Sequence, residues 1–211
     1  MALEQPSQLF RNLKRNIKHL QSRYLNRHLR TAPTGATPST PYSLDVSAFA
    51  VLSHAEFEQF FEETALWVLD EAETIWLTQQ HTCRALVALL AYAGDPPSFD
   101  SGFFDAIRLR MKTLKPNHSK LVESNNGVGI EYLKKLFRPL GLHIPDDARQ
   151  VAALASLAKI RGDRAHRGLL GARIPLDAKA VNLSVTDCLP IASDLVASAQ
   201  TAVKAFALPY R

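Results

Sequence analysis

An arginine and a histidine five residues apart, Arg161 and His166, are the pair in this sequence best suited to phosphate chemistry. Arginine keeps its positive charge and offers a planar fork of N–H donors that matches phosphate oxygens, whereas histidine takes up or releases a proton near neutral pH. Arg164 and Arg167 lie in the same stretch, and Asp163 is its only acid. These residue types predict an anion-binding site that can also transfer a proton.

The Arg-x4-His spacing by itself does not identify the site, because it occurs three times in the chain. Arg138 and His143 are separated by Pro139, which predicts a turn rather than a fixed mutual geometry. Arg23 and His28 lie within a basic helical pattern, where residues five apart point about 140° away from each other. Both of these pairs are therefore interpreted as ordinary surface or loop residues.

The third pair differs in its context. A helical stripe of Leu154, Leu157 and Ile160 leads into it, and Gly162 and Gly168 interrupt the stretch that follows. Gly162 costs a helix interior about 1 kcal/mol, yet it allows a backbone or a phosphate to come close. A competing interpretation is that these residues form the C-terminus of a helix. There, cationic side chains interact favourably with the negative end of the helix dipole, and Gly168 caps the helix.

The positive charge of the chain is concentrated near the N-terminus. Residues 1–30 carry seven Lys and Arg against Glu4 alone, or +6, so the rest of the chain contributes −1 to the total of +5. A basic arm on a near-neutral body predicts a polyanionic partner. Four of its residues are expected to contact that partner: Arg11, Lys14, Arg15 and Lys18.

The arm is also open to other interpretations. Apolar residues at helical spacing predict an amphipathic helix over about residues 5–30, which can pack on the rest of the protein with a solvated basic back. Basic amphipathic helices also bind anionic membranes, and an arginine-rich, acid-poor start is typical of organellar targeting peptides.

The hydrophobic pattern predicts an all-α protein with two parts. Residues 1–42 are expected to form the basic helical arm and a Pro-rich linker, and residues 43–211 a helical bundle domain. Within that domain the predicted helices cover about 43–80, 81–92, 103–114, 130–137, 147–162 and 186–206, with a loop over 167–184. Only residues 179–185 alternate at the period of a strand, and weakly.

The cysteines and the apolar runs of the sequence indicate the cellular compartment that the protein suits. Cys83 and Cys188 have no partner at a metal-binding spacing and are predicted to be packing residues in a reducing, cytoplasmic protein. The start of the chain lacks the pattern of a secretory signal, and the longest apolar run, residues 85–93, falls far short of the roughly 20 residues that cross a bilayer. No membrane span is expected.

Other ionisable residues show no recognisable metal spacing, so neither a metal nor another cofactor is expected. The remaining histidines are interpreted as ordinary helix or loop residues: His54, His81, His118 and His143. The glutamates of the long helix are expected on its solvated face, although one of them can face His166 in the fold: Glu56, Glu58, Glu62 and Glu63.

The stretch Arg-Gly-Asp-Arg-Ala-His at 161–166, reached through the leucine stripe and placed ahead of a last long helix, resembles the Arg-x4-His signature of the HEPN superfamily. The aromatic-rich stretch 55–61 agrees with this resemblance, and residues 125–141 are similar to the short helix before the motif in the RiboL-PSP-like branch. The resemblance covers about residues 44–206 and implies a HEPN-like helical bundle.

The resemblance further implies a metal-independent endoribonuclease that acts as a homodimer on RNA, in a defence, toxin or stress-response setting. His166 would act as general acid or base and Arg161 would stabilise charge on the scissile phosphate, giving a 2′,3′-cyclic phosphate. Asp163, Arg164 and Arg167 would support the pair, and an antitoxin or defence-system protein would be a partner. The alternative is a non-catalytic helical module that binds nucleic acid or protein.

The sequence departs from the superfamily pattern at two positions. Gly162 stands where a polar residue often follows the arginine, and Arg167 intervenes between His166 and Gly168. No tyrosine lies two residues after His166, so regulation by nucleotidylation of such a tyrosine is not expected.

Overall fold

The computed structural model describes residues 3–30, 39–94, 102–145, 147–171 and 176–206. Within these residues every regular element is a helix, and the only strand-type pairing is an isolated bridge between Thr82 and Phe206. The all-α class predicted from the sequence is therefore confirmed.

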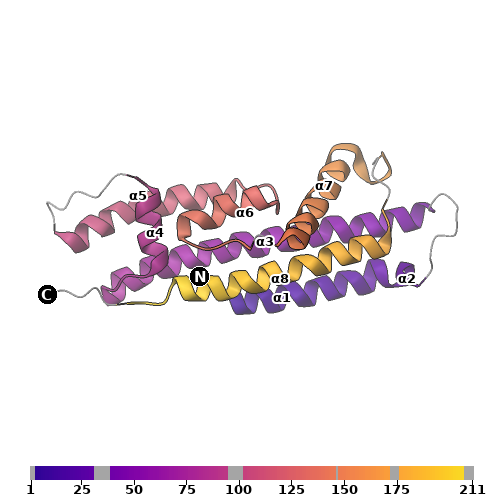
Figure 1. Cartoon of the computed structure of the whole chain (residues 1–211). Coiled ribbons are helices and arrows are strands. Elements are labelled where there is room, and N and C mark those ends of the chain that lie inside the picture. The colour runs from indigo at the N-terminus through magenta and orange to yellow at the C-terminus, as the bar shows by residue number, and fades with distance from the viewer. Residues whose placement is uncertain (1–2, 31–38, 95–101, 146, 172–175, 207–211) are drawn as a thin grey trace.

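The helix α3 (Thr40–Gln79) runs the length of the molecule, and the other helices pack around it (Figure 1). Its 40 residues span about 60 Å at 1.5 Å per residue. The Ser39 hydroxyl accepts a hydrogen bond from the Tyr42 backbone at its start, and Gln80 ends it in a left-handed conformation. The largest fully buried side chains of α3 are aromatic: Phe49, Phe57 and Phe61. The long helix predicted over about residues 43–80 is thus confirmed as one continuous helix.

The N-terminal segment packs along α3 as α1 (Pro6–Leu20), which continues through the π-helical turn η1 (Gln21–Leu25) into α2 (Asn26–Leu29). The rings of Phe10 and Phe60 lie 6.2 Å apart across this contact. The apolar stripe of the segment is buried against the bundle: Leu9, Leu13, Ile17 and Leu25. Of the interpretations left open by the sequence, packing on the bundle is the one observed.

The C-terminal helix α8 (Ala178–Ala202) lies parallel to α3, on the same side of the molecule as α1 (Figure 1). The Ala178 N–H donates to the Tyr42 hydroxyl at 2.9 Å near the start of both helices. Beyond their ends, Thr82 and Phe206 exchange two backbone hydrogen bonds of 3.2 and 2.9 Å. Helices α1, α3 and α8 all contact one another and form a three-helix bundle.

The predicted start of this last helix at residue 186, and the weak strand at 179–185, are wrong. The chain is helical from Ala178, because the Asp177 carboxylate accepts a hydrogen bond from the Ala180 N–H at 2.8 Å and caps the first turn. Val181 and Val185, which gave the apparent alternation, are both buried on one face of α8.

Within the described ranges, α8 is the one helix whose length and mean hydropathy would allow it to cross a membrane. A single such helix is weak evidence for a span, because core helices pass the same test. It contacts α1, α3 and α7, and nine of its residues are buried. One face of α8 therefore belongs to the core of the bundle. Cys188 on α8 and Cys83 are both buried, as predicted for packing residues.

The far end of α3 is covered by α4 (Arg84–Tyr92), α5 (Phe103–Glu123), α6 (Ile130–Phe137) and the 3-10 turn η2 (Arg138–Leu140). Helix α5 and α6 pack on one side of α3, and α4 packs against η2 and α3. The predictions for the helices at 81–92 and 130–137 match α4 and α6 closely.

Helix α5 does not end at Lys115 and Pro116, as the sequence predicts, but continues to Glu123. Lys115 is fixed to α3 because its ammonium group donates to Asp70 at 2.8 Å and also to Glu73. His118, one turn further, is buried. These tertiary contacts outweigh the single backbone hydrogen bond that the proline removes.

Helix α7 (Ala148–Gly171) crosses α3 and α8 and carries the Arg161 and His166 motif toward its C-terminal end, which points away from the three-helix bundle (Figure 1). The predicted end near residue 162 is wrong, because the chain stays helical through Gly162. The break comes at Gly168, whose φ of 72° lies in the region that favours glycine.

Candidate functional site

Arg161 and His166 both lie within α7, and the helix separates their directions. Residues five apart on an α-helix point about 140° away from each other. Arg161 is half-buried and lies near α3, whereas His166 is exposed. One copy of the chain therefore does not bring the two side chains together.

On the Arg161 side, α7 covers two ionisable residues of α3. His54 and Glu58 are one turn apart, with 3.8 Å between Nδ1 and Oε2, and the positive charge of Arg161 acts on both. His54 is almost fully buried, and burial together with the Arg161 charge lowers its pKa to about 4. The Glu58 carboxylate favours a protonated ring, but those two effects outweigh it, so His54 is neutral near pH 7.

Glu58 itself lies in an unfavourable environment for a carboxylate. Burial raises its pKa, repulsion by Glu62 raises it further, and Arg161 partly offsets both effects. The Oε1 atom of Glu58 is buried and has no hydrogen-bond partner. Glu62, one turn further along α3, differs because its Oε1 accepts a hydrogen bond from the Asn125 amide at 3.0 Å.

Arg164 joins α7 to the start of α3. Its side chain is buried, its Nε donates to the Ser47 hydroxyl at 3.3 Å, and its Nη1 donates to the Asp163 carboxylate at 2.8 Å. Burial lowers the pKa of Arg164, and the charge of Asp163 opposes that effect. We therefore assign Arg164 a packing role between the two helices, rather than contact with a ligand.

Asp163 also pairs with Arg167, whose Nε lies 3.4 Å from its second carboxylate oxygen. The three residues that the sequence places around the pair, Asp163, Arg164 and Arg167, are thus held to one another. In contrast, Arg161 and His166 have neither a hydrogen bond nor an ion pair with any other part of the chain that the structure describes.

The two glycines of the motif have different roles. A Cβ atom added at Gly162 would meet nothing within 4 Å, so close packing does not require glycine there, and the helix is open to an approaching group. Gly168 is required by its positive φ, and it ends the regular part of α7 as the helix-terminus interpretation expected.

The basic residues of the N-terminal segment lie far around α3 from this motif. Asn16 of α1 donates to Glu56 at 2.8 Å, and Glu56 is two residues from both His54 and Glu58. Two residues correspond to about 200° around a helix, so α1 and α7 contact nearly opposite sides of α3. The structure leaves four basic residues exposed on α1, away from Arg161: Arg11, Lys14, Arg15 and Lys18.

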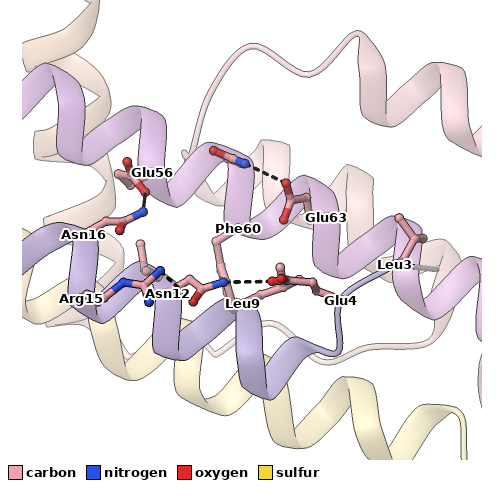
Figure 2. Close-up of a pocket in the computed structure, with 11 residues that line it drawn as sticks. Leu3, Glu4, Leu9, Asn12, Arg15, Asn16, Glu56, Phe60 and Glu63 are labelled. Carbon is pink, nitrogen blue, oxygen red and sulfur yellow. Dashed lines mark hydrogen bonds between the residues drawn. The ribbon is translucent and has the colours of Figure 1, made fainter. Parts of the chain in front are cut away.

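A groove of about 430 Å³ lies between α1 and α3 (Figure 2). Phe60 and other apolar side chains form part of its lining, and its rim carries three carboxylates, from Glu4, Glu56 and Glu63. Arg15 is the only cation among the lining residues. This excess of negative charge opposes phosphate binding, so the groove is not the anion site predicted from the sequence.

The other two Arg-x4-His pairs lie in a contact between helices and at a turn. His28 hydrogen-bonds to the Asp45 carboxylate at 2.6 Å and packs its ring edge-on against Tyr42, which ties α2 to α3. Burial raises the Asp45 pKa, but the hydrogen bonds from His28 and Arg27 hold it below its usual value. Arg138 and His143 flank the turn at η2 and are both exposed.

Sequence reasoning did not identify His54 and Glu58 as part of the site. Their spacing of four residues signals a shared helix face, but not which face α7 covers. Glu58 was expected among four solvated glutamates, but its side chain is only 19% exposed and the charge of Arg161 acts on it. No group of three or more metal-ligating side chains is found in the described part of the chain.

Comparisons of the chain with protein-family models, with curated proteins and with solved structures found no match.

Proposed function

We propose that this protein is an endoribonuclease that cleaves RNA without a metal ion, with Arg161 and His166 as its catalytic residues and a second copy of the chain completing the site. The resemblance of the motif to the HEPN superfamily and the helical bundle of the structure both support this function. A toxin or defence setting, with a partner protein that restrains the activity, follows from the same resemblance.

One observation carries the proposal. Of the five polar residues of the motif, Asp163 pairs with both Arg164 and Arg167, whereas Arg161 and His166 have neither a hydrogen bond nor an ion pair among the described residues. A guanidinium group has five N–H donors in a fork that matches phosphate, and these donors remain available on Arg161. His166 is exposed on the same helix and can exchange protons with a bound substrate.

The direction of the two side chains calls for a dimer. Because they diverge by about 140° on α7, Arg161 of one copy meets a histidine only if the α7 helices of two copies face each other. In a two-fold dimer each copy supplies the same groups, so Arg161 would act with His166 of the partner subunit, and the reverse.

The reaction needs only these groups, because RNA supplies its own nucleophile. The ribose 2′-oxygen would form a bond to phosphorus while the bond to the 5′-oxygen breaks, and one imidazole would accept the 2′-hydroxyl proton. The departing 5′-oxygen would take its proton from water, and the imidazolium would return its proton to the solvent. Arg161 would stabilise the added negative charge on the phosphate oxygens. The products are a 2′,3′-cyclic phosphate and a 5′-hydroxyl.

Incubation of the purified protein with mixed RNA in EDTA tests the function. We expect cleavage by the wild type and a loss of at least about a hundredfold for His166→Ala, since a proton-transfer group contributes 10² to 10⁴. Equal cleavage by the variant would overturn the assignment. RNA binding without any cleavage would favour the alternative, a non-catalytic binding module.

Mixing two inactive variants tests the shared site. In a heterodimer of Arg161→Ala and His166→Ala, one of the two sites retains an intact arginine from one copy and an intact histidine from the other. Random mixing should restore about a quarter of the wild-type activity. If each site used both residues of one copy, the mixture would stay inactive.

A further inference from the structure

The groove between α1 and α3 is formed by two helix faces with the same spacing of residues. On each helix the main lining residues follow one another at intervals of three, one and three, so they share one face. The two sets are Leu9, Asn12, Leu13 and Asn16 on α1, and Glu56, Gln59, Phe60 and Glu63 on α3. The groove therefore runs along both helices for about two turns, or roughly 10 Å.

The groove combines an apolar middle with carboxylates at both ends (Figure 2). Leu9 of α1 and Phe60 of α3 line its middle and are almost fully buried in the packing of the two helices. Glu56 lies at one end, whereas Glu63 and Glu4 lie toward the other. A ligand along the groove would thus meet an apolar surface between two negative charges.

The three carboxylates are held in place without being neutralised. Each accepts one hydrogen bond from an uncharged amide: Glu4 from Asn12 at 2.9 Å, Glu56 from Asn16 at 2.8 Å and Glu63 from Gln59 at 2.7 Å. None of them forms an ion pair within the residues that the structure describes. Arg15, the one cation of the lining, donates to the Asn12 amide oxygen instead. The lining therefore has a net charge of −2.

This arrangement suits an organic cation better than a metal ion. A metal ion needs several ligands that converge on one point, but Glu56 and Glu63 lie at opposite ends of the groove. No group of three or more metal-ligating side chains occurs in the described ranges. An aliphatic polyamine offers methylene groups for the apolar middle and ammonium groups for the carboxylates, which are charged at neutral pH like that of lysine.

We propose that this groove binds a linear aliphatic polyamine, whose methylene chain lies on Leu9 and Phe60 and whose two terminal ammonium groups pair with Glu56 and Glu63. The length of spermidine agrees with this placement. Glu56 and Glu63 are seven residues apart, or about 10 Å along α3. The terminal nitrogens of spermidine are joined by nine single bonds, as many as in three extended residues, which span roughly 10–11 Å. This site is independent of the RNA cleavage proposed above.

Isothermal titration calorimetry of the full chain with spermidine at constant ionic strength tests the proposal. We expect one site with a Kd below about 1 mM. Glu56→Gln and Glu63→Gln should each raise Kd at least about fivefold, because each removes one charge and keeps an oxygen that accepts the amide hydrogen bond. Glu71→Gln, on α3 outside the groove, is the matched control and should change Kd less than twofold. Equal effects of the three variants, or no saturable binding, would overturn the proposal.

Two further probes separate a fitted groove from general attraction to acidic residues. Putrescine has five bonds between its nitrogens, or roughly 6 Å, so it cannot reach both ends and should bind at least about fivefold more weakly than spermidine. Mg²⁺ has the same charge as putrescine but no apolar part, and it should compete with spermidine less well than putrescine does. Equal competition by Mg²⁺ and putrescine would contradict the proposal.

A peptide probe distinguishes a small ligand from a protein partner. The peptide Lys-Leu-Leu-Lys also carries cations on both sides of an apolar segment. If spermidine does not bind while this peptide binds and is weakened by Glu56→Gln, the groove is a docking site for a basic protein segment, and the proposal is overturned. Binding of spermidine with the expected loss in both groove variants supports it, whether or not the protein cleaves RNA.

Discussion

Arg164 donates a hydrogen bond to the hydroxyl of Ser47 across the interface of α7 and α3, and the two residues are 117 positions apart in the chain. The arginine is buried and also bonds to Asp163, its neighbour on α7. This contact fixes the end of α7 that carries the motif, so Arg164 has a structural role between the two helices.

Removal of Arg164 should therefore destabilise the fold. We expect Arg164→Ala to lower the free energy of unfolding by about 2 kcal/mol, because it leaves buried polar groups without their partner. The control is Arg167→Ala, whose side chain is largely exposed and pairs with the same aspartate, and which should cost less than about 0.5 kcal/mol. Urea unfolding measures both; equal losses would contradict the assigned role.

The two glycines of the motif should respond in opposite directions to substitution by alanine. Gly162 is helical and has open space around its Cβ position, so Gly162→Ala should raise the free energy of unfolding by about 0.5–1 kcal/mol. Gly168 has a φ of 72°, so Gly168→Ala should lower it by about 1 kcal/mol. Thermal unfolding of the two variants distinguishes them, and a reversed order would argue against the helix end described here.

Burial of His54 should make stability depend on pH. Its pKa is about 4 in the folded protein against 6.5 as its ordinary value, so the unfolded chain binds more protons between these values. The stabilising contribution is complete above pH 6.5 and is lost as the pH falls toward 4, by at most about 3 kcal/mol. Burial lowers the pKa of His118 as well, with the same sign.

The measurement compares the wild type with His54→Gln in urea at pH 7 and pH 5. The raised pKa values of Glu58 and Glu62 act in the opposite sense, so the comparison of slopes isolates the histidine. We expect the variant to lose less stability on acidification than the wild type does. Identical slopes would mean that His54 is not buried in its neutral form.

The packing of α1 predicts that its apolar residues stabilise the whole bundle. Leu13 is only 2% exposed, and Leu13→Ala should lower the free energy of unfolding by about 2–4 kcal/mol. Lys18→Ala, on an exposed position of the same helix, should change it by less than about 0.5 kcal/mol. If the segment were a free tether for RNA, neither substitution would affect stability.

Much of the fold follows from local patterns. The stretch after Ser43 contains neither proline nor glycine and carries apolar residues at helical spacing, which is enough to predict α3. The predicted helix ends were wrong where a tertiary contact outweighs a local sequence signal. Pro116 lies in the middle of α5 because Lys115 is bound to α3, and Gly162 does not end α7 because the helix is held by Arg164 beyond it.

The candidate site was predicted in part. The divergence of Arg161 and His166 follows from helix geometry alone, whereas the place of Glu58 depends on which face of α3 packs under α7. That choice is made by contacts between segments about 100 residues apart, such as Ser47 with Arg164, and no local pattern encodes it. For the same reason, the sequence did not predict that α1 and the motif lie on nearly opposite sides of α3.

The most direct test of the central claim is the identity of the products from a short defined RNA in EDTA, analysed by mass spectrometry. The wild type should give a 2′,3′-cyclic phosphate and a 5′-hydroxyl, and an RNA with one 2′-deoxyribose should resist cleavage at that position. Arg161→Ala and His166→Ala should give neither product. A 3′-hydroxyl with a 5′-phosphate, cleavage at the deoxyribose, or full activity of either variant would contradict the account.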